Sequence, residues 1–275
     1  MMHEAMRYKR VDGRDLIADV YRAADRTPSG APAIACFHGG GWVHGDRTEF
    51  SHFCERYARK GFVAVTFQYR LSARPGSTHP DPDVTPVECV KDARSGLRWI
   101  RANAQTLGVD PDRIVVAGQS AGGQLALCTA LADGVDEPGD DLAISPVPAA
   151  IVLYASCVNT VIPWVDWHLG DRREEIWSIS PYHLARPGMP PVIHFHGDAD
   201  CVVLPYQVRH FADRMAELGN GYDLQWYEGR GHLLAPQLDT YARYFDDEVL
   251  QRTDLFLAAH GLAGVKQRGL SSNTG

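Results

Sequence analysis

One segment of the sequence restricts the fold more than any other. Residues 113–134 predict a strand, a sharp turn with Ser120 at its tip, and a helix. The run from Ile114 to Ala117 is apolar and rich in β-branched residues, which is typical of a buried strand. A G-x-S-x-G pattern follows, and leucines and alanines then recur at helical spacing. A serine so placed is either a nucleophile held before a helix N-terminus or part of a glycine-rich turn that only packs a helix on a sheet.

Apolar runs of strand length alternate with segments of helical periodicity along most of the chain. The expected strands are residues 33–37, 62–68, 149–155, 191–196 and 222–227, preceded by a hairpin of residues 6–11 and 15–21. The expected helices, besides the one after Ser120, are residues 46–60, 87–107, 205–218 and 236–260. This alternation predicts a mostly parallel sheet covered by helices, and the length of 275 residues suits one such α/β domain.

The composition excludes several classes of function. The net charge of -7 is spread along the chain, so we expect no nucleic-acid partner. No apolar run approaches the ~20 residues of a membrane span, and the first residues lack the apolar core of a secretory signal, so we expect no membrane partner. The six cysteines are scattered without a C-x-x-C pair, which favours reduced thiols in a cytoplasmic protein over a disulfide framework. The polar residues 264–275 predict a disordered tail.

A second glycine-rich loop follows the expected strand 33–37. Residues 38–42 are His-Gly-Gly-Gly-Trp. Glycines have no Cβ to block a ligand, so such a loop can point backbone N–H groups at an oxyanion. The alternative is a flexible glycine turn. We favour the oxyanion role because the loop follows a buried strand in a chain that also carries the G-x-S-x-G pattern.

These two motifs, together with the YRL tripeptide that begins at Tyr69, resemble those of the α/β-hydrolase superfamily. The likeness is to its esterase branch with an HGGG motif, which includes hormone-sensitive-lipase-like carboxylesterases and feruloyl esterase, acetylxylan esterase and kynurenine-formamidase-like enzymes. It implies an α/β-hydrolase fold with a mostly parallel central sheet of about eight strands, helices on both faces and a small cap insertion. We expect a single domain over residues 1–275, with the cap at residues 157–190.

The resemblance also implies roles for single residues of the two glycine-rich motifs. Gly40, Gly41 and Ala121 would supply the backbone N–H donors of an oxyanion hole. His38 would brace the loop and would not act as the base. Asp92 matches the aspartate of a helical D-x-x-x-A-x-x-W pattern, with glycine in place of the alanine, and is expected to be structural.

The acid and the base of the implied catalytic triad follow the last two strands. The family pattern H-G-x-x-D-x-x-V-P places the acid at Asp200, although this chain has one residue more before the proline. Asp198 in the same turn competes, and we expect it to cap the turn instead. His232 lies in a glycine loop directly after the strand 222–227, which gives the order Ser120, Asp200, His232 that the fold requires.

Two groups of side chains leave alternatives open. His194 and His196 alternate on one strand, which is compatible with a metal pair, but no third ligand stands at a fixed spacing. We therefore expect no metal and no other cofactor. Trp164 and Trp167 in the cap segment, with Trp42 of the HGGGW loop, either line a substrate pocket or pack the cap onto the core.

The most specific expectation is a serine carboxylesterase that forms an acyl-serine intermediate. The HGGG motif begins at residue 38, which leaves little room before it for a large N-terminal cap, so we expect an open pocket and small, short-chain acyl or aryl esters as substrates. An arylformamidase of the kynurenine-formamidase kind and a feruloyl or acetylxylan esterase are alternatives with the same chemistry. A non-catalytic binding protein on the same fold is the alternative of another class. Homodimers are common in this branch, but no segment of the sequence is diagnostic of an interface.

Overall fold

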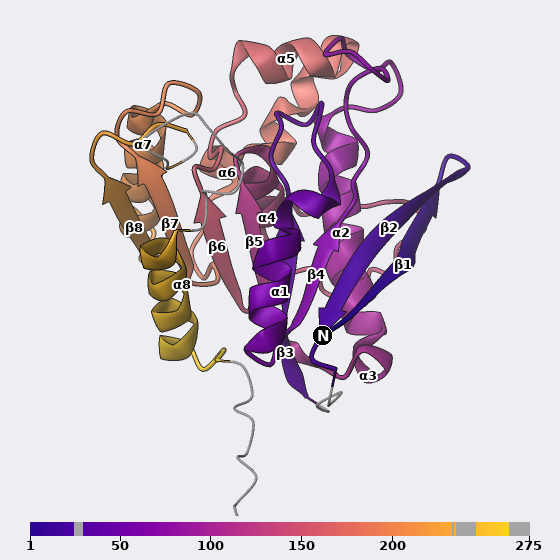
Figure 1. The fold of residues 1–275 in the computed structure, drawn as a ribbon. Helices are drawn as coiled ribbons and strands as arrows, with labels where there is room; N and C mark the ends of the chain where they lie inside the picture. Colours follow the sequence, from indigo (N-terminus) through magenta and orange to yellow (C-terminus); the bar gives the residue numbers. More distant parts are fainter. Residues whose placement is uncertain (25–29, 233, 235–245, 264–275) are drawn as a thin grey trace, which may run out of the picture.

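Eight strands form one sheet at the centre of the structure, a computed structural model that describes residues 1–24, 30–232, 234 and 246–263 (Figure 1). In chain order the strands are β1 (Met2–Val11), β2 (Arg14–Arg22), β3 (Ala31–Phe37), β4 (Val63–Phe67), β5 (Val109–Gln119), β6 (Ala150–Tyr154), β7 (Val192–Gly197) and β8 (Tyr222–Tyr227). Their order across the sheet is β1-β2-β4-β3-β5-β6-β7-β8. The predicted α/β class with its mostly parallel sheet is confirmed.

The strands from β4 to β8 across the sheet run parallel, whereas β1 and β2 are antiparallel to their neighbours. Every residue of β3, β4 and β6 is buried, as expected for strands that are covered on both faces. Parallel strands all end at the same edge of a sheet, so the loops after β3, β5, β7 and β8 meet there. Figure 1 shows this edge at the top of the molecule, beneath the helix α5 (Pro163–Leu169).

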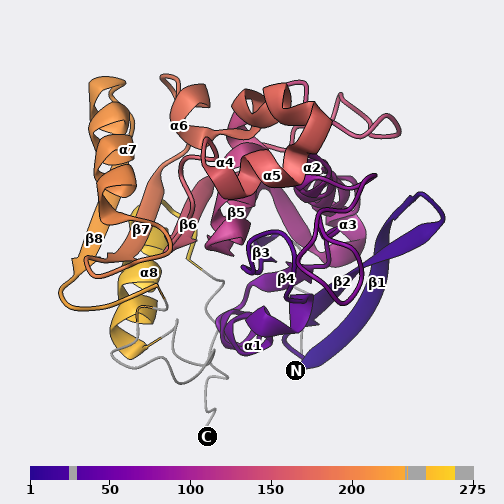
Figure 2. The ribbon, with the colours of Figure 1, turned by 90° about the horizontal axis from the view of Figure 1, so that it is seen from above.

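Helices cover both faces of the sheet (Figure 2). One apolar core lies between the sheet and α2, α4 and α7, and the other between the sheet and α1 and α8. The bounds are α1 (Ser51–Arg59), α2 (Pro86–Ala102), α3 (Ala104–Leu107), α4 (Ala121–Leu131), α7 (Pro205–Glu217) and α8 (Asp247–Ala259). Apolar side chains at helical spacing explain the packing, for example Val87, Val90 and Leu97 on α2.

Two elements differ from the expectation. The helix expected over residues 87–107 is two helices, because the chain leaves the helical path at Asn103, where φ is -103° and ψ is 17°. The strand expected from residue 113 begins earlier, because residues 109–113 are the first part of β5. They are strand because Val109 pairs with Ala31 of β3, across an irregularity in the register. Pairing with β3 therefore makes residues 109–113 a strand, although this segment contains aspartate and proline, which are typical of turns.

Other segments agree with the expectation or lie outside the described residues. The helix expected over residues 46–60 begins with a capping box of Asp46 and Glu49, first as a 3₁₀ helix η1 (Arg47–Phe50) that runs into α1. Of the expected closing helix the structure describes α8, from Asp247, while residues 236–245 and the tail 264–275 lie outside the described residues.

The expected cap segment, residues 157–190, contains three short helical elements between β6 and β7. They are α5, the 3₁₀ helix η2 (Gly170–Ile179) and α6 (Pro181–Leu184). Figure 1 shows α5 above the edge where the parallel strands end. The division into a single domain with a cap insertion stays a prediction.

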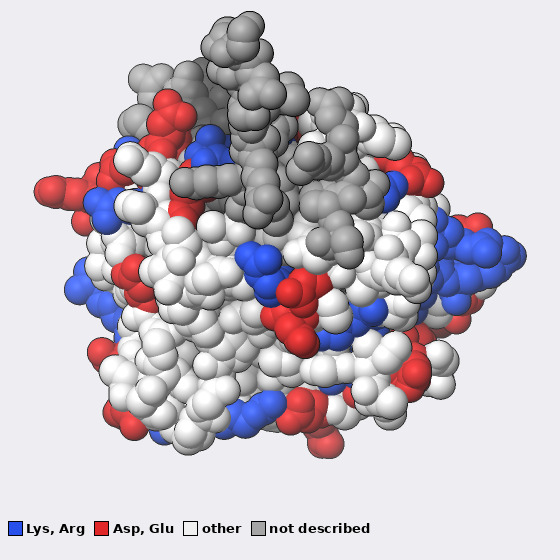
Figure 3. Space-filling view, turned by 90° about the horizontal axis from the view of Figure 1, so that it is seen from below, with Lys and Arg blue, Asp and Glu red and all other residues white. Residues whose placement is uncertain are grey.

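The face opposite to this edge carries charges of both signs (Figure 3). The largest positive group lies at the side where the β1–β2 hairpin projects. There Arg7 and Arg10 each pair with Asp15, at 3.4 and 3.5 Å. Among the helices in the described part of the chain, none is long and apolar enough to cross a membrane.

Candidate active site

Ser120 stands in the turn between β5 and α4. Its backbone has φ 51° and ψ -118°, a conformation that costs a non-glycine residue about 1–3 kcal/mol. The surroundings hold it there: its amide donates to the Tyr154 carbonyl at 3.0 Å, and its carbonyl accepts from the Cys157 amide at 3.1 Å. A Cβ on Gly118 or Gly122 would collide with backbone atoms, so the small residues of the motif let the helix begin directly against the strands.

Two further side chains reach the serine from the ends of other strands. The Nε2 atom of His232 lies 3.0 Å from Oγ of Ser120, and its Nδ1 atom lies 2.8 Å from Oδ2 of Asp200. Asp200 follows β7 and His232 follows β8, so the parallel sheet brings the three predicted residues together. With Nδ1–H donated to the carboxylate, Nε2 is left as the acceptor for the serine hydroxyl. This arrangement can activate a serine nucleophile.

Asp200 is held by its own turn. Its Oδ1 atom accepts hydrogen bonds from the amides of Val202 at 2.8 Å and Val203 at 3.0 Å, and its side chain is fully buried. On the other side, Nε2 of His196 lies 3.5 Å from Oδ2 of Asp200 and 3.0 Å from the Val203 carbonyl oxygen. Burial lowers the pKa of His196, so its ring is neutral at pH 7. These contacts direct Oδ2 of the carboxylate toward His232.

Asp198, the competing carboxylate, has a different partner. Its Oδ1 atom accepts a hydrogen bond from the Gly229 amide at 2.6 Å. Its own amide donates to the Tyr227 carbonyl at 3.1 Å, so Asp198 joins the turn after β7 to the turn after β8. The structure therefore brings Asp200, and not Asp198, to His232.

Hydrogen bonds that its carbonyl groups accept fix the conformation of the HGGGW loop after β3. The carbonyl oxygen of Gly39 accepts from Nδ1 of His38 at 2.8 Å and lies 3.2 Å from the Tyr69 hydroxyl. Burial lowers the pKa of His38 to about 4, so the ring donates as a neutral imidazole at pH 7. The peptide bond is trans, so the N–H of Gly40 points to the side opposite these partners. The position of His38 therefore agrees with the predicted role of supporting the loop and not of acting as the base.

The next peptide of the loop is fixed in the same way. The Gly40 carbonyl accepts from the amides of Val43 at 3.1 Å and His44 at 3.2 Å, so the N–H of Gly41 points to the other side. Within the described ranges of the chain, no group accepts a hydrogen bond from the amides of Gly40, Gly41 or Ala121. Ala121 is the first residue of α4, where amides are free to bind an anion. The three predicted donors are thus available to a ligand.

The three tryptophans predicted as pocket residues take different positions. Trp42 is buried, and its Nε1 atom donates to Oε1 of Gln124 at 3.0 Å. Trp164 of α5 is 36% exposed, and its Nε1 atom donates to the Gly41 carbonyl at 3.1 Å. Trp167 is 43% exposed, with its ring centre 5.5 Å from that of Trp164. Trp42 therefore ties the loop to α4 and Trp164 ties it to the cap segment, and their role in a pocket stays a prediction.

His194 and His196, considered as a metal pair, are buried and take part in hydrogen bonds. The Nε2 atom of His194 accepts from the Ser156 amide at 3.1 Å, which leaves its Nδ1–H for the Tyr222 hydroxyl oxygen. Burial, followed by the neighbouring His196, lowers the pKa of His194 well below its usual value. Among the residues for which the structure gives a placement, no three His, Cys, Asp or Glu side chains form a group that could hold a metal ion.

The sequence did not predict how the HGGGW loop is held from outside. Ser72 donates from its amide to the Trp42 carbonyl at 2.7 Å, and Tyr69 contacts the other end of the loop. The only signal was the YRL tripeptide after β4, the strand that pairs with β3. No feature of the sequence indicated the bond from Trp164 to Gly41.

The chain resembles esterases in sequence. Residues 18–148 match the family model BD-FAE. The chain is 27% identical over 241 residues to esterase LipC of Mycobacterium tuberculosis, across 76% of this chain and 57% of that protein. It is 26% identical over 237 residues to the probable isoprenylcysteine alpha-carbonyl methylesterase ICMEL1 of Oryza sativa subsp. japonica, across 78% of this chain and 53% of that protein. The chain thus spans little more than half the length of the curated relatives it matches.

The fold resembles solved esterases over a longer range. Thermogutta terrifontis esterase 2 phosphoramylated by tabun has a TM-score of 0.84 and 36% sequence identity, over 96% of this chain and 97% of that chain. The butyrate-bound form of the same esterase has a TM-score of 0.83 and 35% identity, over 96% of both chains. The similarity therefore extends along nearly the whole of both chains.

Proposed function

Because the chain belongs to the esterase branch of the α/β-hydrolase superfamily, we propose that it is a serine carboxylesterase with Ser120 as its nucleophile. The observation that carries the proposal is the hydrogen-bonded line from Ser120 through His232 to Asp200. This line lies at the edge of the sheet to which the HGGGW loop brings its amides. The 36% identity to an esterase along 96% of this chain supports the same activity.

Acylation is the first half of the proposed reaction. Oγ of Ser120 attacks the ester carbonyl carbon while Nε2 of His232 takes the hydroxyl proton. The carbonyl oxygen becomes an oxyanion, and the amides of Gly40, Gly41 and Ala121 donate hydrogen bonds to it. When the tetrahedral intermediate collapses, His232 returns the proton to the leaving alkoxide. The alcohol departs and the acyl group stays on the serine as an ester.

Deacylation repeats these steps with water as the nucleophile. His232 takes a proton from water, the hydroxide oxygen attacks the acyl carbon, and the proton then returns to Ser120. Asp200 keeps Nδ1 of His232 protonated and stabilises the imidazolium that forms in each half. The two amides at Oδ1 of Asp200 keep its carboxylate in place. The products are a carboxylic acid and an alcohol, and no cofactor takes part.

The proposed substrates are small esters with a short acyl chain or an aryl group. The Thermogutta terrifontis esterase has been solved with propionate and with butyrate bound, which are short carboxylates of the kind such a reaction releases. The exposed rings of Trp164 and Trp167, beside the HGGGW loop, favour an apolar or aromatic group on the substrate. Aryl formamides and feruloyl or acetylxylan esters remain within the same chemistry. The hydrogen-bonded triad argues against a non-catalytic binding protein.

Hydrolysis of p-nitrophenyl esters from acetate to dodecanoate tests the proposal. We expect turnover that is highest for the short chains and is lost in Ser120→Ala. Ser145→Ala, a change of the same kind in the loop between α4 and β6, should keep the wild-type rate. A fluorophosphonate probe should label wild-type protein on Ser120 and leave Ser120→Ala unlabelled. Folded protein that neither hydrolyses these esters, aryl formamides and feruloyl esters nor reacts with the probe would contradict the proposal.

The proposal extends to the location and the assembly of the protein. A cytoplasmic location follows from the cysteine pattern of the sequence, and the lack of nucleic-acid and membrane partners follows from its charge and hydropathy. The family resemblance favours a homodimer. Light scattering on the purified protein would decide between a monomer and a dimer.

A further inference from the structure

A short segment after β4 lies along the HGGGW loop and contacts it at both ends. We call this segment, residues 69–72, the brace. The Tyr69 hydroxyl lies 3.0 and 3.2 Å from the carbonyl oxygens of the first two loop residues. At the other end, Ser72 donates to the Trp42 carbonyl from its amide at 2.7 Å and from its Oγ at 3.2 Å. Tyr69 and Ser72 are both buried, so water does not compete for these bonds.

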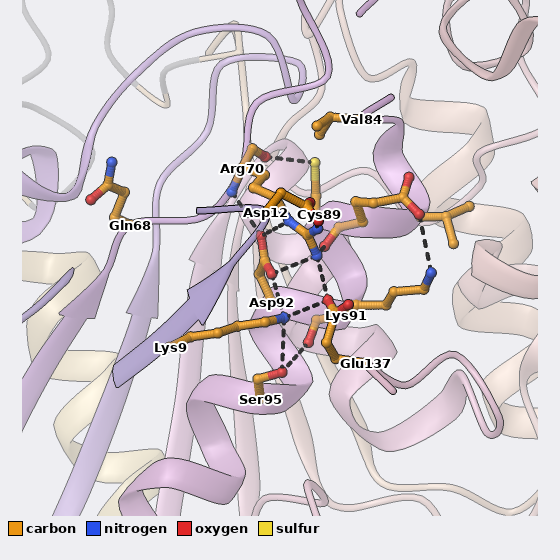
Figure 4. Close-up of polar contacts among 12 residues, drawn as sticks. Lys9, Asp12, Gln68, Arg70, Val84, Cys89, Lys91, Asp92, Ser95 and Glu137 are labelled. Carbon is orange, nitrogen blue, oxygen red and sulfur yellow. Dashed lines mark hydrogen bonds and ion pairs between the residues drawn. The ribbon is translucent and has the colours of Figure 1, made fainter. Parts of the chain in front are cut away.

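Arg70, inside the brace, is fixed to α2 by its side chain and by its backbone (Figure 4). Its Nε atom and its own amide both donate to Oδ2 of Asp92 at 2.9 Å, and its Nη2 atom donates to Oδ1 at 2.9 Å. Its carbonyl accepts from the Cys89 thiol at 2.9 Å. Asp92 thus binds the main chain and the side chain of one residue at the same time. This double contact fixes the position of the brace as well as the rotamer of Arg70.

Charged side chains next to the Arg70–Asp92 pair form further ion pairs with it and with each other. Nζ of Lys9, from β1, lies 2.6 Å from Oδ1 of Asp92 and 2.7 Å from Oε2 of Glu137. Glu137 also accepts from Nη2 of Arg70 at 2.5 Å. The side chains of Arg70, Asp92 and Lys9 are only 4%, 0% and 7% exposed. Moving any of them would leave a buried charge without its partner, so the cluster resists displacement of the brace.

We propose that Arg70 and Asp92 are positioning residues of the reaction: they hold the brace, and the brace holds the amides that bind the oxyanion. The inference rests on the proposed function, because it assigns these residues a part in the same oxyanion hole. The link is the planar peptide between Gly39 and Gly40. The Tyr69 hydroxyl contacts its carbonyl side, so a shift of the brace turns the N–H of Gly40 on the opposite side.

The rate should be sensitive to such a shift. Oxyanion donors act within a narrow range of distance from the charged oxygen, and a donor that turns away loses much of its effect. The loss falls on the transition state, because the neutral ester carbonyl depends less on these bonds than the oxyanion does. A loosened brace should therefore lower kcat more than it raises KM. A cluster that served stability alone would change the fraction of folded protein and leave the kcat of the folded enzyme unchanged.

A pair of esters that differ in one atom tests the oxyanion contact. In a thiono ester, sulfur replaces the carbonyl oxygen, and sulfur is a weak hydrogen-bond acceptor. The readout is the ratio of kcat/KM for the oxo ester to kcat/KM for the thiono ester. Asp92→Asn keeps the shape of the side chain and removes its charge. We expect it to lower kcat for the oxo ester about tenfold, with a smaller effect on the thiono ester, so that the ratio falls.

Two further variants allow the same test if the Asp92→Asn protein does not fold. Tyr69→Phe removes only the hydroxyl that contacts the loop, and Arg70→Lys keeps the positive charge but not the paired bonds to Asp92. Both should lower the ratio. Because Asp92 is proposed to act through the brace, the effects of Asp92→Asn and Tyr69→Phe on the ratio should be less than additive in the double variant.

Asp254→Asn is the matched control. Asp254 also pairs with two cations, Arg56 at 2.6 Å and Lys60 at 2.8 Å, but between α1 and α8 on the other face of the sheet. It should leave the ratio unchanged even where it lowers the melting temperature.

The outcomes separate the inference from the proposed function. If the wild type shows Ser120-dependent turnover and Tyr69→Phe or folded Arg70→Lys keeps the wild-type ratio, the inference is overturned and the proposed function stands. A fall of the ratio in Asp254→Asn equal to that in Asp92→Asn would also overturn it, because the effect would then follow stability. If the wild type shows no Ser120-dependent turnover, the proposed function fails and the inference fails with it.

Discussion

The Asp200 carboxylate and the HGGGW loop lie on the two sides of the serine and are held by different sets of contacts. On the acid–base side, Asp200 accepts from amides that lie two and three residues further along the chain. On the oxyanion side, Gly39 is contacted by Tyr69, which is 30 residues away. Gly41 is bound by Trp164, which is 123 residues away. The Asp200 carboxylate is thus held by its own turn, whereas the HGGGW loop, besides its local bonds to the Gly40 carbonyl, needs the segment after β4 and the cap segment in place.

This difference has a consequence for how the site responds to change. A local turn keeps its geometry as long as its own few residues can bond, because its contacts carry little loop-closure entropy. Long-range contacts depend on the packing of every element between the partners. Substitutions that loosen the packing of the segment after β4 or of the cap segment should therefore displace the HGGGW loop before they displace the Asp200 carboxylate.

The largest expected effect is on the acid–base side. Asp200→Asn keeps the shape of the side chain, but its amide group no longer holds His232 in the tautomer that accepts the serine proton. We expect kcat to fall about 10⁴-fold on p-nitrophenyl acetate. Asp198→Asn is the matched control, because its carbonyl oxygen can still accept from the Gly229 amide, and it should keep most of the wild-type rate. The opposite ranking of the two variants would show that Asp198 is the acid.

The next largest effect is on the oxyanion side. Gly40 has φ 102°, and a Cβ there would collide with the His44 carbonyl oxygen, so Gly40→Ala must shift the loop. We expect kcat to fall about 10²- to 10³-fold, with a smaller change in KM. Gly134→Ala also introduces a side chain at positive φ, 80°, but with no atom within 4 Å of its Cβ, so it should cost stability and not rate. If Gly40→Ala and Gly134→Ala had equal rates, the HGGGW loop would have no part in the reaction.

The part of the site that was predictable from the sequence is the part whose residues lie in recognisable motifs at the ends of predicted strands. The turn at Ser120 follows from small residues between a strand and a helix, and the order of Ser120, Asp200 and His232 follows from where the strands end. The hydrogen bonds between these three residues agree with that order. The α/β fold was predictable for a related reason, since buried strands and amphipathic helices carry their period in the sequence.

The remainder depends on partners that are distant in the sequence. Nothing near Val109 shows that it continues a strand, because that strand begins where Ala31 offers a partner. The break at Asn103 lies inside a pattern of uninterrupted helical period. Likewise, no local signal couples Trp164 to Gly41, since a tryptophan in an irregular segment can pack in many directions. Such contacts follow from the tertiary packing and not from propensity.

Acid pH should weaken the oxyanion side of the molecule through His38. Burial lowers its pKa from 6.5 to about 4, so below pH 6.5 the unfolded chain binds a proton that the folded protein does not. Stability is therefore lost as the pH falls from about 6.5 to about 4, by about 3 kcal/mol in total for this group. Urea unfolding at about pH 7 and about pH 4 should show that His38→Gln loses less stability over this interval than the wild type. Equally steep losses in both proteins would exclude His38 as the source.

The smallest expected effect concerns the bond between the cap segment and the loop. Trp164→Phe keeps an aromatic ring but removes the N–H that donates to the Gly41 carbonyl. One such bond contributes about 0.5–1.5 kcal/mol, so kcat should fall about two- to tenfold, and by the same factor for every ester. Trp167→Phe makes the same change in the neighbouring ring, which donates no bond to the loop among the described residues, and should leave kcat unchanged while KM rises for aryl esters. If Trp164→Phe instead altered only KM, in proportion to the size of the substrate, Trp164 would line the substrate pocket and would not support the HGGGW loop.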